Sequence, residues 1–157
     1  MTDLSWYKTL PKKRMGAGVI LLNDKDELLI VKPIYKDHWT LPGGVVDENE
    51  SLRSAAQREV KEELGLQVDE LRLVCVDYVS KEGEKDDNLQ FLFYGGKLSE
   101  KQIISIQLPA DELAEYKFLP IDEALKLVSD KFKRRLPPSM DAVKSNSAVY
   151  LENGIII

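Results

Sequence analysis

The amino-acid sequence predicts an α/β fold in which helices cover a mixed β-sheet. The chain has 157 residues, about the size of one ordinary domain. Its predicted elements run in the order strands, one long helix, more strands and then helices, which is typical of a layered α/β structure. No repeat, low-complexity stretch or long linker interrupts it. We therefore predict a single domain over 1–157, with an N-terminal arm (1–13) and a C-terminal helical segment (130–157).

The first predicted elements are the two strands of a hairpin. Apolar residues dominate 15–22, and 23–26 form a turn before 28–32 returns as the second strand. Pro33 ends that strand. Residues 37–44 form a loop whose Leu-Pro-Gly-Gly ending provides a rigid turn and two residues free to adopt positive φ.

The long helix is predicted over 51–64. Its apolar residues recur at every fourth position, which places them on one face: Leu52, Ala56, Val60 and Leu64. Gly65 follows at the position where glycine commonly ends a helix.

The second half of the chain carries weaker patterns. We predict strands over 71–80, 89–94 and 117–119, a short helix over 121–128, and a last helix that begins at Pro137-Pro138 and continues to about residue 150. Gly95-Gly96 is expected to bend the end of the second of these strands. Cys75 alternates with apolar neighbours, so we expect it in the core.

Composition excludes several classes of site. Cys75 is the single cysteine and His38 the single histidine, which excludes an internal disulfide, a thiolate zinc cluster and any site with two imidazoles. The net charge of −5 argues against a protein dedicated to polymeric nucleic acid. No apolar stretch approaches the ~20 residues of a membrane span, and 1–13 lacks a signal-peptide core. We expect a cytoplasmic protein that does not bind membranes.

Three carboxylates lie close together on the predicted helix. Residues spaced i, i+3 and i+4 are neighbours on a helix, so Glu59, Glu62 and Glu63 share a sector about 100° wide. Their mutual repulsion costs a few tenths of a kcal/mol per pair, roughly. A hard divalent cation would remove this cost, because Mg²⁺ and Mn²⁺ prefer oxygen ligands.

Neighbouring residues extend this acidic cluster. Glu50 can join from the start of the helix, and Arg58 lies four residues before Glu62, where a forked hydrogen bond could orient that carboxylate. Gly43 and Gly44 lack side chains, so their carbonyl groups could approach the same ion. Taken alone, however, three acidic residues in five are more typical of a solvated helix face.

A wider pattern favours the metal site. The sequence fits G-x5-E-x7-R-E-U-x-E-E-x-G-U, where U is aliphatic, at Gly44, Glu50, Arg58, Glu59, Val60, Glu62, Glu63, Gly65 and Leu66. A chance match of the seven fixed residues has odds of about one in 10⁸ per window at average usage. This pattern is the complete Nudix box, Gly44 to Leu66, and the chain resembles the Nudix hydrolase family.

The resemblance implies a fold and a chemistry. The fold would be a Nudix-type α/β/α sandwich with a mixed central sheet and a loop–helix–loop catalytic motif. Family members hydrolyse a nucleoside diphosphate linked to another group X, using Mg²⁺ or Mn²⁺. By motif position, Glu59, Glu62 and Glu63 would bind the metal together with the Gly43 carbonyl. Glu59 would also assist the attacking water, with Glu62 and Arg58 in the catalytic set.

One further glutamate enters through the resemblance. Many relatives carry a glutamate six residues before an aromatic residue in the strand after the box, and Glu112 stands six residues before Phe118. We include Glu112 among the predicted catalytic residues, while an ordinary acidic loop is an equally good interpretation.

The substrate is predicted by elimination. ADP-ribose-specific relatives often have a proline where this chain has Glu82, and Tyr78 is too early for the tyrosine of diadenosine polyphosphate hydrolases. This leaves a small-molecule nucleotide, most simply a nucleoside triphosphate hydrolysed by a house-cleaning pyrophosphohydrolase. ADP-ribose or nucleotide-sugar pyrophosphatase and RNA 5′-end pyrophosphohydrolase remain alternatives, as do a nucleotide-sensing domain without activity and a protein whose acidic helix binds a basic partner. A homodimer is also left open.

Four other residues have mainly structural interpretations. His38 is more typical of a surface loop than of a catalytic base, and Trp39 either packs over the hairpin or stacks on a nucleobase. For Trp6 and Tyr7 we expect packing of the tail, ahead of contacts with substrate or a partner subunit.

Overall fold

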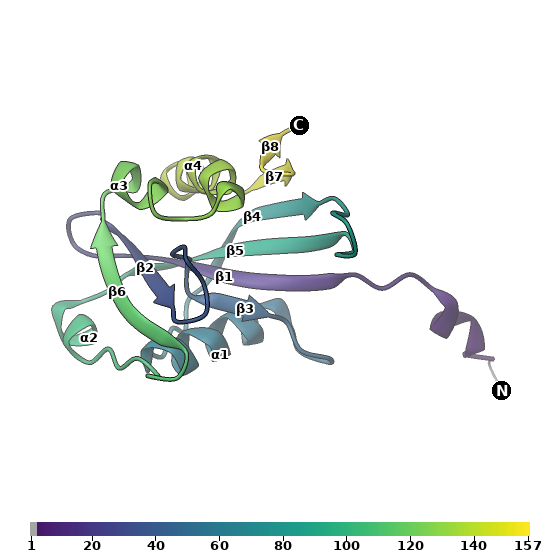
Figure 1. The fold of residues 1–157 in the computed structure, drawn as a ribbon, viewed down its shortest axis with the longest axis horizontal. Helices are drawn as coiled ribbons and strands as arrows, with labels where there is room; N and C mark the ends of the chain where they lie inside the picture. Colours follow the sequence, from purple (N-terminus) through teal and green to yellow (C-terminus); the bar gives the residue numbers. More distant parts are fainter. Residues whose placement is uncertain (1–2) are drawn as a thin grey trace.

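A mixed β-sheet with helices on both faces forms the protein, and the structure, a computed structural model, describes residues 3–157 (Figure 1). The elements in chain order are a 3₁₀ helix η1 (Ser5–Thr9), β1 (Arg14–Leu22), β2 (Leu28–Pro33), β3 (Gly43–Val45), α1 (Leu52–Leu64), β4 (Arg72–Val79), β5 (Asn88–Lys97), α2 (Glu100–Ile104), β6 (Leu113–Leu119), α3 (Ile121–Leu125), α4 (Asp130–Lys144), β7 (Val149–Glu152) and β8 (Ile155–Ile156). None of the helices in this range is long and apolar enough to cross a membrane.

The sheet has the strand order β6-β2-β1-β5-β4-β7-β8, and β3 pairs with β1 outside this path. Strand β1 therefore pairs on one side with two segments: Leu22 lies opposite Leu28 of β2, and Gly16 lies opposite Val45 of β3. The β1–β5 and β4–β7 pairs are parallel and the others are antiparallel. The predicted mixed sheet is confirmed.

Alternate residues of β1 enter two separate cores. Val19 and Leu21 pack toward α1, whereas Ile20 and Leu22 pack toward α3 and α4. All four are almost completely buried, as expected for a strand covered on both faces. Figure 1 shows α1 and α2 on one side of the sheet and α3 and α4 on the other, so the predicted α/β/α sandwich is confirmed.

Helix α1 matches the prediction closely. The Ser51 hydroxyl accepts a hydrogen bond from the Ser54 N–H at the N-cap, and Gly65 ends the helix with φ of +71°. Ala56, Val60 and Leu64 are fully buried against the sheet. The opposite face of α1 is thereby left to its charged residues.

The last helix differs from the prediction. It begins at Asp130, seven residues before Pro137, with Ser129 as N-cap, and both Pro137 and Pro138 lie inside it. An interior proline is costly because it removes a helix hydrogen bond, by about 3 kcal/mol or more. Packing outweighs that cost here, because Leu136 and Met140 are buried against the sheet.

The C-terminal segment is also less helical than predicted. Helix α4 ends at Lys144, and Tyr150, predicted to close the helix, lies in β7. Strand β7 extends the sheet parallel to β4, and β8 then forms its edge. The description of 130–157 as a helical segment is therefore wrong for its last part.

Other differences are additions and shifts of boundaries. Gly43 and Gly44, predicted as the end of a loop, belong to β3. Helix α2 was not predicted, although Ser99 and Gln102 form a capping box at its start. Strand β6 begins at Leu113, four residues before the predicted start, and the helix predicted over 121–128 ends at Leu125.

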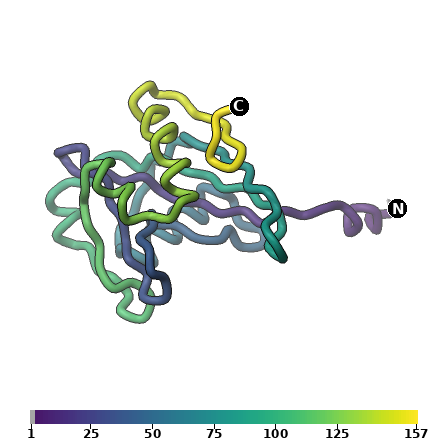
Figure 2. Tube along the Cα trace, turned by 45° about the horizontal axis from the view of Figure 1, so that its top comes forward, coloured from purple at the N-terminus to yellow at the C-terminus, as the bar shows by residue number. Residues whose placement is uncertain are grey.

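Residues 3–13 of the N-terminal arm project from the body of the protein (Figure 2). The 3₁₀ helix at its start contains no buried residue, and Trp6 and Tyr7 are 60% and 58% exposed. The predicted packing of this tail is therefore wrong. Trp39, in contrast, is buried in the core beneath α3 and α4, which leaves its ring unavailable for stacking on a base, and Cys75 is buried as predicted.

Candidate active site

The box residues surround β3 and the start of α1. Strand β3 pairs with β1, which brings Gly43 and Gly44 against the acidic face of α1. The loop between β3 and α1 is closed at its base: the Asp47 N–H donates to the Glu50 carboxylate (2.9 Å) and the Glu50 N–H to the Asp47 carbonyl (3.2 Å). Glu50 is thereby directed toward the helix.

Arg58 is the centre of the acidic cluster. Its Nε and Nη2 atoms donate to the two oxygens of Glu50 at 2.8 and 3.0 Å, and Nη1 donates to Glu59 at 2.8 Å and to Glu62 at 3.2 Å. The predicted forked hydrogen bond to Glu62 is therefore wrong. The fork is made with Glu50, because the closed loop presents both oxygens of that carboxylate side by side to the guanidinium.

The single positive charge of Arg58 is shared by several carboxylates in this cluster. Hydrogen bonding to Arg58 lowers the pKa of Glu50 below its ordinary value, and Glu50 in turn raises the pKa of Arg58. These two groups form the strongest pair, so Glu59 and Glu62 share what remains of the same guanidinium. Negative charge is in excess on this face of α1.

Glu63 shows the effect of that excess most clearly. It is 9% exposed, and its carboxylate accepts a hydrogen bond from the Gly43 N–H at 3.2 Å. Burial, followed by repulsion from Glu59, Glu112 and Glu62, raises the pKa of Glu63 to about 8. A carboxyl group in this state is stabilised either by a proton or by a cation.

A close backbone contact requires glycine at position 43, and Gly44 leaves room for the Glu59 carboxylate. Gly43 has φ of +152°, and a Cβ atom there would lie 2.4 Å from the Ala17 carbonyl oxygen. A Cβ atom on Gly44 would lie 2.4 Å from Oε1 of Glu59. The Glu59 carboxylate thus rests directly on the backbone of Gly44, and its burial raises its pKa above the ordinary value.

Glu112 lies immediately before β6, where its carbonyl oxygen accepts a hydrogen bond from the Ile34 N–H at 2.9 Å. Its carboxylate is close enough to raise the pKa of both Glu59 and Glu63 by repulsion. The fold therefore brings the negative charge of Glu112 to the box glutamates, although the residue is distant in sequence.

These residues suit a divalent cation in their chemistry. The donors are crowded carboxyl oxygens, several of which share one guanidinium, and hard cations prefer oxygen ligands. Within 3–157 no three acidic, histidine or cysteine side chains converge on one point as they stand. Arg58 lies between Glu59 and Glu62, so a cation would draw these two carboxylates out of their hydrogen bonds with its Nη1 atom.

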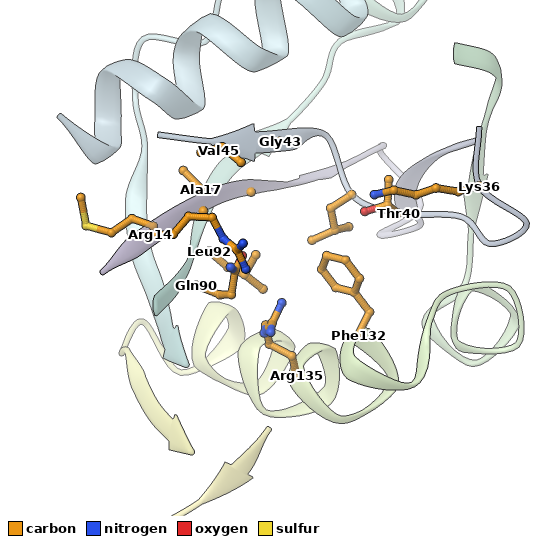
Figure 3. Close-up of a pocket in the computed structure, with 15 residues that line it drawn as sticks. Arg14, Ala17, Lys36, Thr40, Gly43, Val45, Gln90, Leu92, Phe132 and Arg135 are labelled. Atoms are coloured by element: carbon orange, nitrogen blue, oxygen red, sulfur yellow. The ribbon is translucent and has the colours of Figure 1, made fainter. Parts of the chain in front are cut away.

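A cavity lies on the α4 side of the sheet, next to β3. Its volume is about 290 Å³, and it is bordered by β1, β3, β5, the loop before β3 and α4. Figure 3 shows the side chains of Arg14, Gln90, Phe132 and Arg135 around it, with Lys36 and Thr40 at the other end. Gly43, Gly44 and Val45 line it as well, so β3 separates the cavity from the glutamates of α1.

Sequence reasoning missed this cavity. Arg135 and Gln90 belong to elements far apart in the chain and carry no local motif. The spaced glycines Gly16 and Gly18 were the available signal, since they leave the floor of the cavity open beside Gln90 and Leu92. His38, Trp39 and Cys75 take no part in either the acidic cluster or the cavity lining.

Comparison with known proteins decides the family. The model of the NUDIX domain matches residues 12–140. The chain belongs to the NUDIX family. This match includes the box, the strands that hold it and most of α4, so the acidic cluster and the cavity both lie within the NUDIX domain.

Individual relatives agree with this assignment. The chain is 30% identical over 132 residues to an RNA pyrophosphohydrolase of Pelagibacter ubique, covering 74% of this chain and 82% of that protein. It is 39% identical over 61 residues to an RNA pyrophosphohydrolase of Hydrogenovibrio crunogenus, but this match spans only 37% of that relative and 39% of this chain. The crystal structure of a UDP-X diphosphatase superposes with a TM-score of 0.73 at 20% identity, covering 94% of this chain and 71% of that one. At this identity the likeness concerns the fold.

Proposed function

We propose that this NUDIX protein is a nucleoside triphosphate pyrophosphohydrolase, which uses Mg²⁺ or Mn²⁺ to cleave a nucleotide at a pyrophosphate bond. The observation that carries the proposal is the crowding of the Glu59, Glu62 and Glu63 carboxyl groups on one helix, where burial and mutual repulsion raise the pKa of Glu63. A cavity large enough for part of a nucleotide lies beside them. Water would add to one phosphorus atom, the P–O–P bridge would break, and a triphosphate would yield a monophosphate and pyrophosphate.

Different residues of the box would bind the metal, position the carboxylates and accept a proton. Glu59, Glu62 and Glu63 would hold the metal, with the Gly43 backbone beside them, and Arg58 keeps Glu59 and Glu62 on one side of α1. Glu59 is our candidate for accepting the proton of the attacking water, because it lies against the Gly44 backbone and burial raises its pKa above its ordinary value. The metal, when bound, would neutralise the pyrophosphate and favour deprotonation of the water.

Glu112 is proposed as an additional carboxylate of this site. Its charge already acts on Glu59 and Glu63, and it reaches them from the loop that precedes β6, outside the box. A carboxylate delivered from this side could hold a metal-bound substrate or share the proton transfer with Glu59.

A second candidate substrate is the 5′-triphosphate end of RNA. The similarity to the Pelagibacter RNA pyrophosphohydrolase, which extends over most of both chains, favours it. The bond cleaved and the box residues would be the same. The ratio of kcat/KM for a 5′-triphosphorylated oligoribonucleotide to that for a free nucleoside triphosphate distinguishes the two substrates.

The proposal is tested by product analysis with the four common nucleoside triphosphates in ¹⁸O-water. We expect a monophosphate and pyrophosphate, with ¹⁸O in one of the two, only when Mg²⁺ or Mn²⁺ is present, and no turnover in EDTA. Label in orthophosphate alone would identify a phosphatase, and tight nucleotide binding without turnover would identify a sensing domain. Either result contradicts the proposal.

A further inference from the structure

The cavity beside β3 contains a buried arginine whose outer donors are free. Arg135 is 4% exposed, and its Nε atom donates to Oδ2 of Asp77 at 2.7 Å. Throughout the described range, 3–157, the two terminal nitrogens of Arg135 have no hydrogen-bond partner. Neither nitrogen is sealed from solvent, and Arg135 lines the cavity, so these N–H groups are available to a ligand.

Contacts with Asp77 and Phe132 fix the position of the Arg135 side chain. Asp77 is 1% exposed, and its other carboxylate oxygen accepts a hydrogen bond from the Gly154 N–H at 3.0 Å. The guanidinium carbon lies 5.3 Å from the centre of the Phe132 ring, one turn earlier on α4. Arg135 is thus held as a rigid pair of donors that points into the cavity toward Gln90 and Arg14 (Figure 3).

An acceptor with an equally fixed orientation lies on the cavity floor. The amide nitrogen of Gln90 donates to Oδ1 of Asn88 at 2.7 Å, and no donor in the described part of the chain (3–157) reaches the Gln90 oxygen, which can therefore accept from a ligand. This oxygen lies over Gly16, where a Cβ atom would come within 2.3 Å of it. Gly16 therefore keeps space for the amide and for a ligand above it.

The remaining lining selects for a flat, acceptor-bearing group. Phe132, Leu41 and Leu92 provide apolar surface, and a planar ring would stack well on the Phe132 side chain. None of the fifteen lining residues, all within the described range, is acidic, whereas Arg14, Lys36 and Arg135 are cationic. A volume of about 290 Å³ accommodates a nucleobase and part of its sugar.

We propose that Arg135 and Gln90 select nucleotides whose base has a carbonyl group next to a ring N–H. The terminal N–H groups of Arg135 would donate to the carbonyl oxygen, and the Gln90 oxygen would accept from the ring N–H. Guanine, hypoxanthine and uracil have this edge, whereas adenine and cytosine place an amino group and a bare nitrogen there. This inference rests on the proposed function only in assigning the bound compound as the substrate.

The expected discrimination is large because mismatches are doubly unfavourable. Adenine would place an amino donor against the donors of Arg135 and a lone pair against the oxygen of Gln90. Sites built to hydrogen-bond a particular edge reject an analogue that leaves buried groups unpaired. We therefore expect kcat/KM to be at least ~10-fold higher for GTP than for ATP, and higher for UTP than for CTP.

The experiment compares these substrate pairs within each enzyme preparation. A ratio of two kcat/KM values is independent of the fraction of folded protein, so loss of stability does not alter it. In Arg135→Gln and in Gln90→Leu we expect the GTP/ATP ratio to fall to within about 2-fold of unity, from ~10-fold. Lys36→Gln is the matched control, because Lys36 lines the same cavity outside the Asp77–Arg135 pair, and it should keep the ratio.

Binding without turnover separates this inference from the proposed function. Calorimetric titration with guanosine and adenosine in EDTA should show selective binding of guanosine, lost in Gln90→Leu. If no nucleotide is hydrolysed but guanosine binds selectively, the inference stands and the proposed function fails. If all four triphosphates are hydrolysed equally, or if inorganic phosphate displaces guanosine, the inference is overturned and the cavity is either unselective or an anion site.

Discussion

Two arginines on opposite faces of the sheet illustrate how differently the same side chain can be used. Arg58 is shared by Asp47, Glu50, Glu59 and Glu62, whereas among residues 3–157 Arg135 pairs with Asp77 as its single acidic partner. The first arrangement leaves negative charge in excess and the second leaves N–H donors in excess. The α1 face is therefore suited to a cation, and the α4 face to hydrogen-bond acceptors of a ligand.

The two arginines also differ in how far their side chains are buried. The Arg58 side chain is 27% exposed and that of Arg135 is 5% exposed. Solvent can screen the first network, so its carboxylates can exchange the guanidinium for a metal ion without exposing an unpaired buried charge. Separating the second pair would leave a buried charge without a partner, at a large cost in free energy. We therefore expect Arg135 to keep its orientation when a ligand binds.

The largest expected effect is on the α1 face. Glu62→Gln keeps the size of the side chain and removes one negative charge from the acidic cluster, so kcat should fall on the order of 10²-fold. The melting temperature should stay the same or rise slightly, because repulsion of Glu59 and Glu63 is relieved. Kinetics and thermal melts on the purified variant test this.

Glu48→Gln is the matched control for that experiment. Glu48 is exposed in the loop of the same box and has the same chemistry, so its loss should leave kcat within about 2-fold. If Glu62→Gln remained fully active and lost several degrees of melting temperature, the acidic cluster would be structural.

The next effect is on stability and depends on pH. The pKa of Glu63 is raised from 4.5 to about 8 in the folded, metal-free protein. Between these values the folded state holds a proton that the unfolded chain has released, so the free energy of unfolding should decrease as pH rises from about 4.5 to about 8. Denaturant titrations in EDTA across this range measure the slope.

Glu63→Gln supplies the comparison, since glutamine does not titrate. The variant should lose most of the slope and be the more stable protein at the alkaline end, while excess Mg²⁺ should flatten the slope of the natural protein. An equal slope in both proteins would assign the titration to another group and would weaken the case for Glu63 as a metal ligand.

The local parts of both faces could be predicted from the sequence. The apolar spacing of α1 and the positions of Glu59, Glu62 and Glu63 depend on helix geometry within one or two turns, so the structure agrees with them. The fork between Arg58 and Glu50 spans eight residues and depends on the closed loop of the box. Local spacing does not specify such a contact.

The α4 face could not be predicted, because its contacts join distant parts of the chain. Arg135 and Asp77 are 58 residues apart, and their meeting depends on the packing of α4 against β4. Pro137 was misleading for a related reason: proline favours the first turn of a helix, but burial of Leu136 and Met140 keeps this helix continuous through it.

The central claim is that the excess negative charge of the α1 face binds a divalent cation, and direct titration with Mn²⁺ tests it. Electron paramagnetic resonance of the free ion should show binding by the natural protein and by Glu48→Gln, and binding weakened at least ~10-fold in Glu62→Gln and Glu63→Gln. Equal Mn²⁺ affinity in all four proteins would contradict the account.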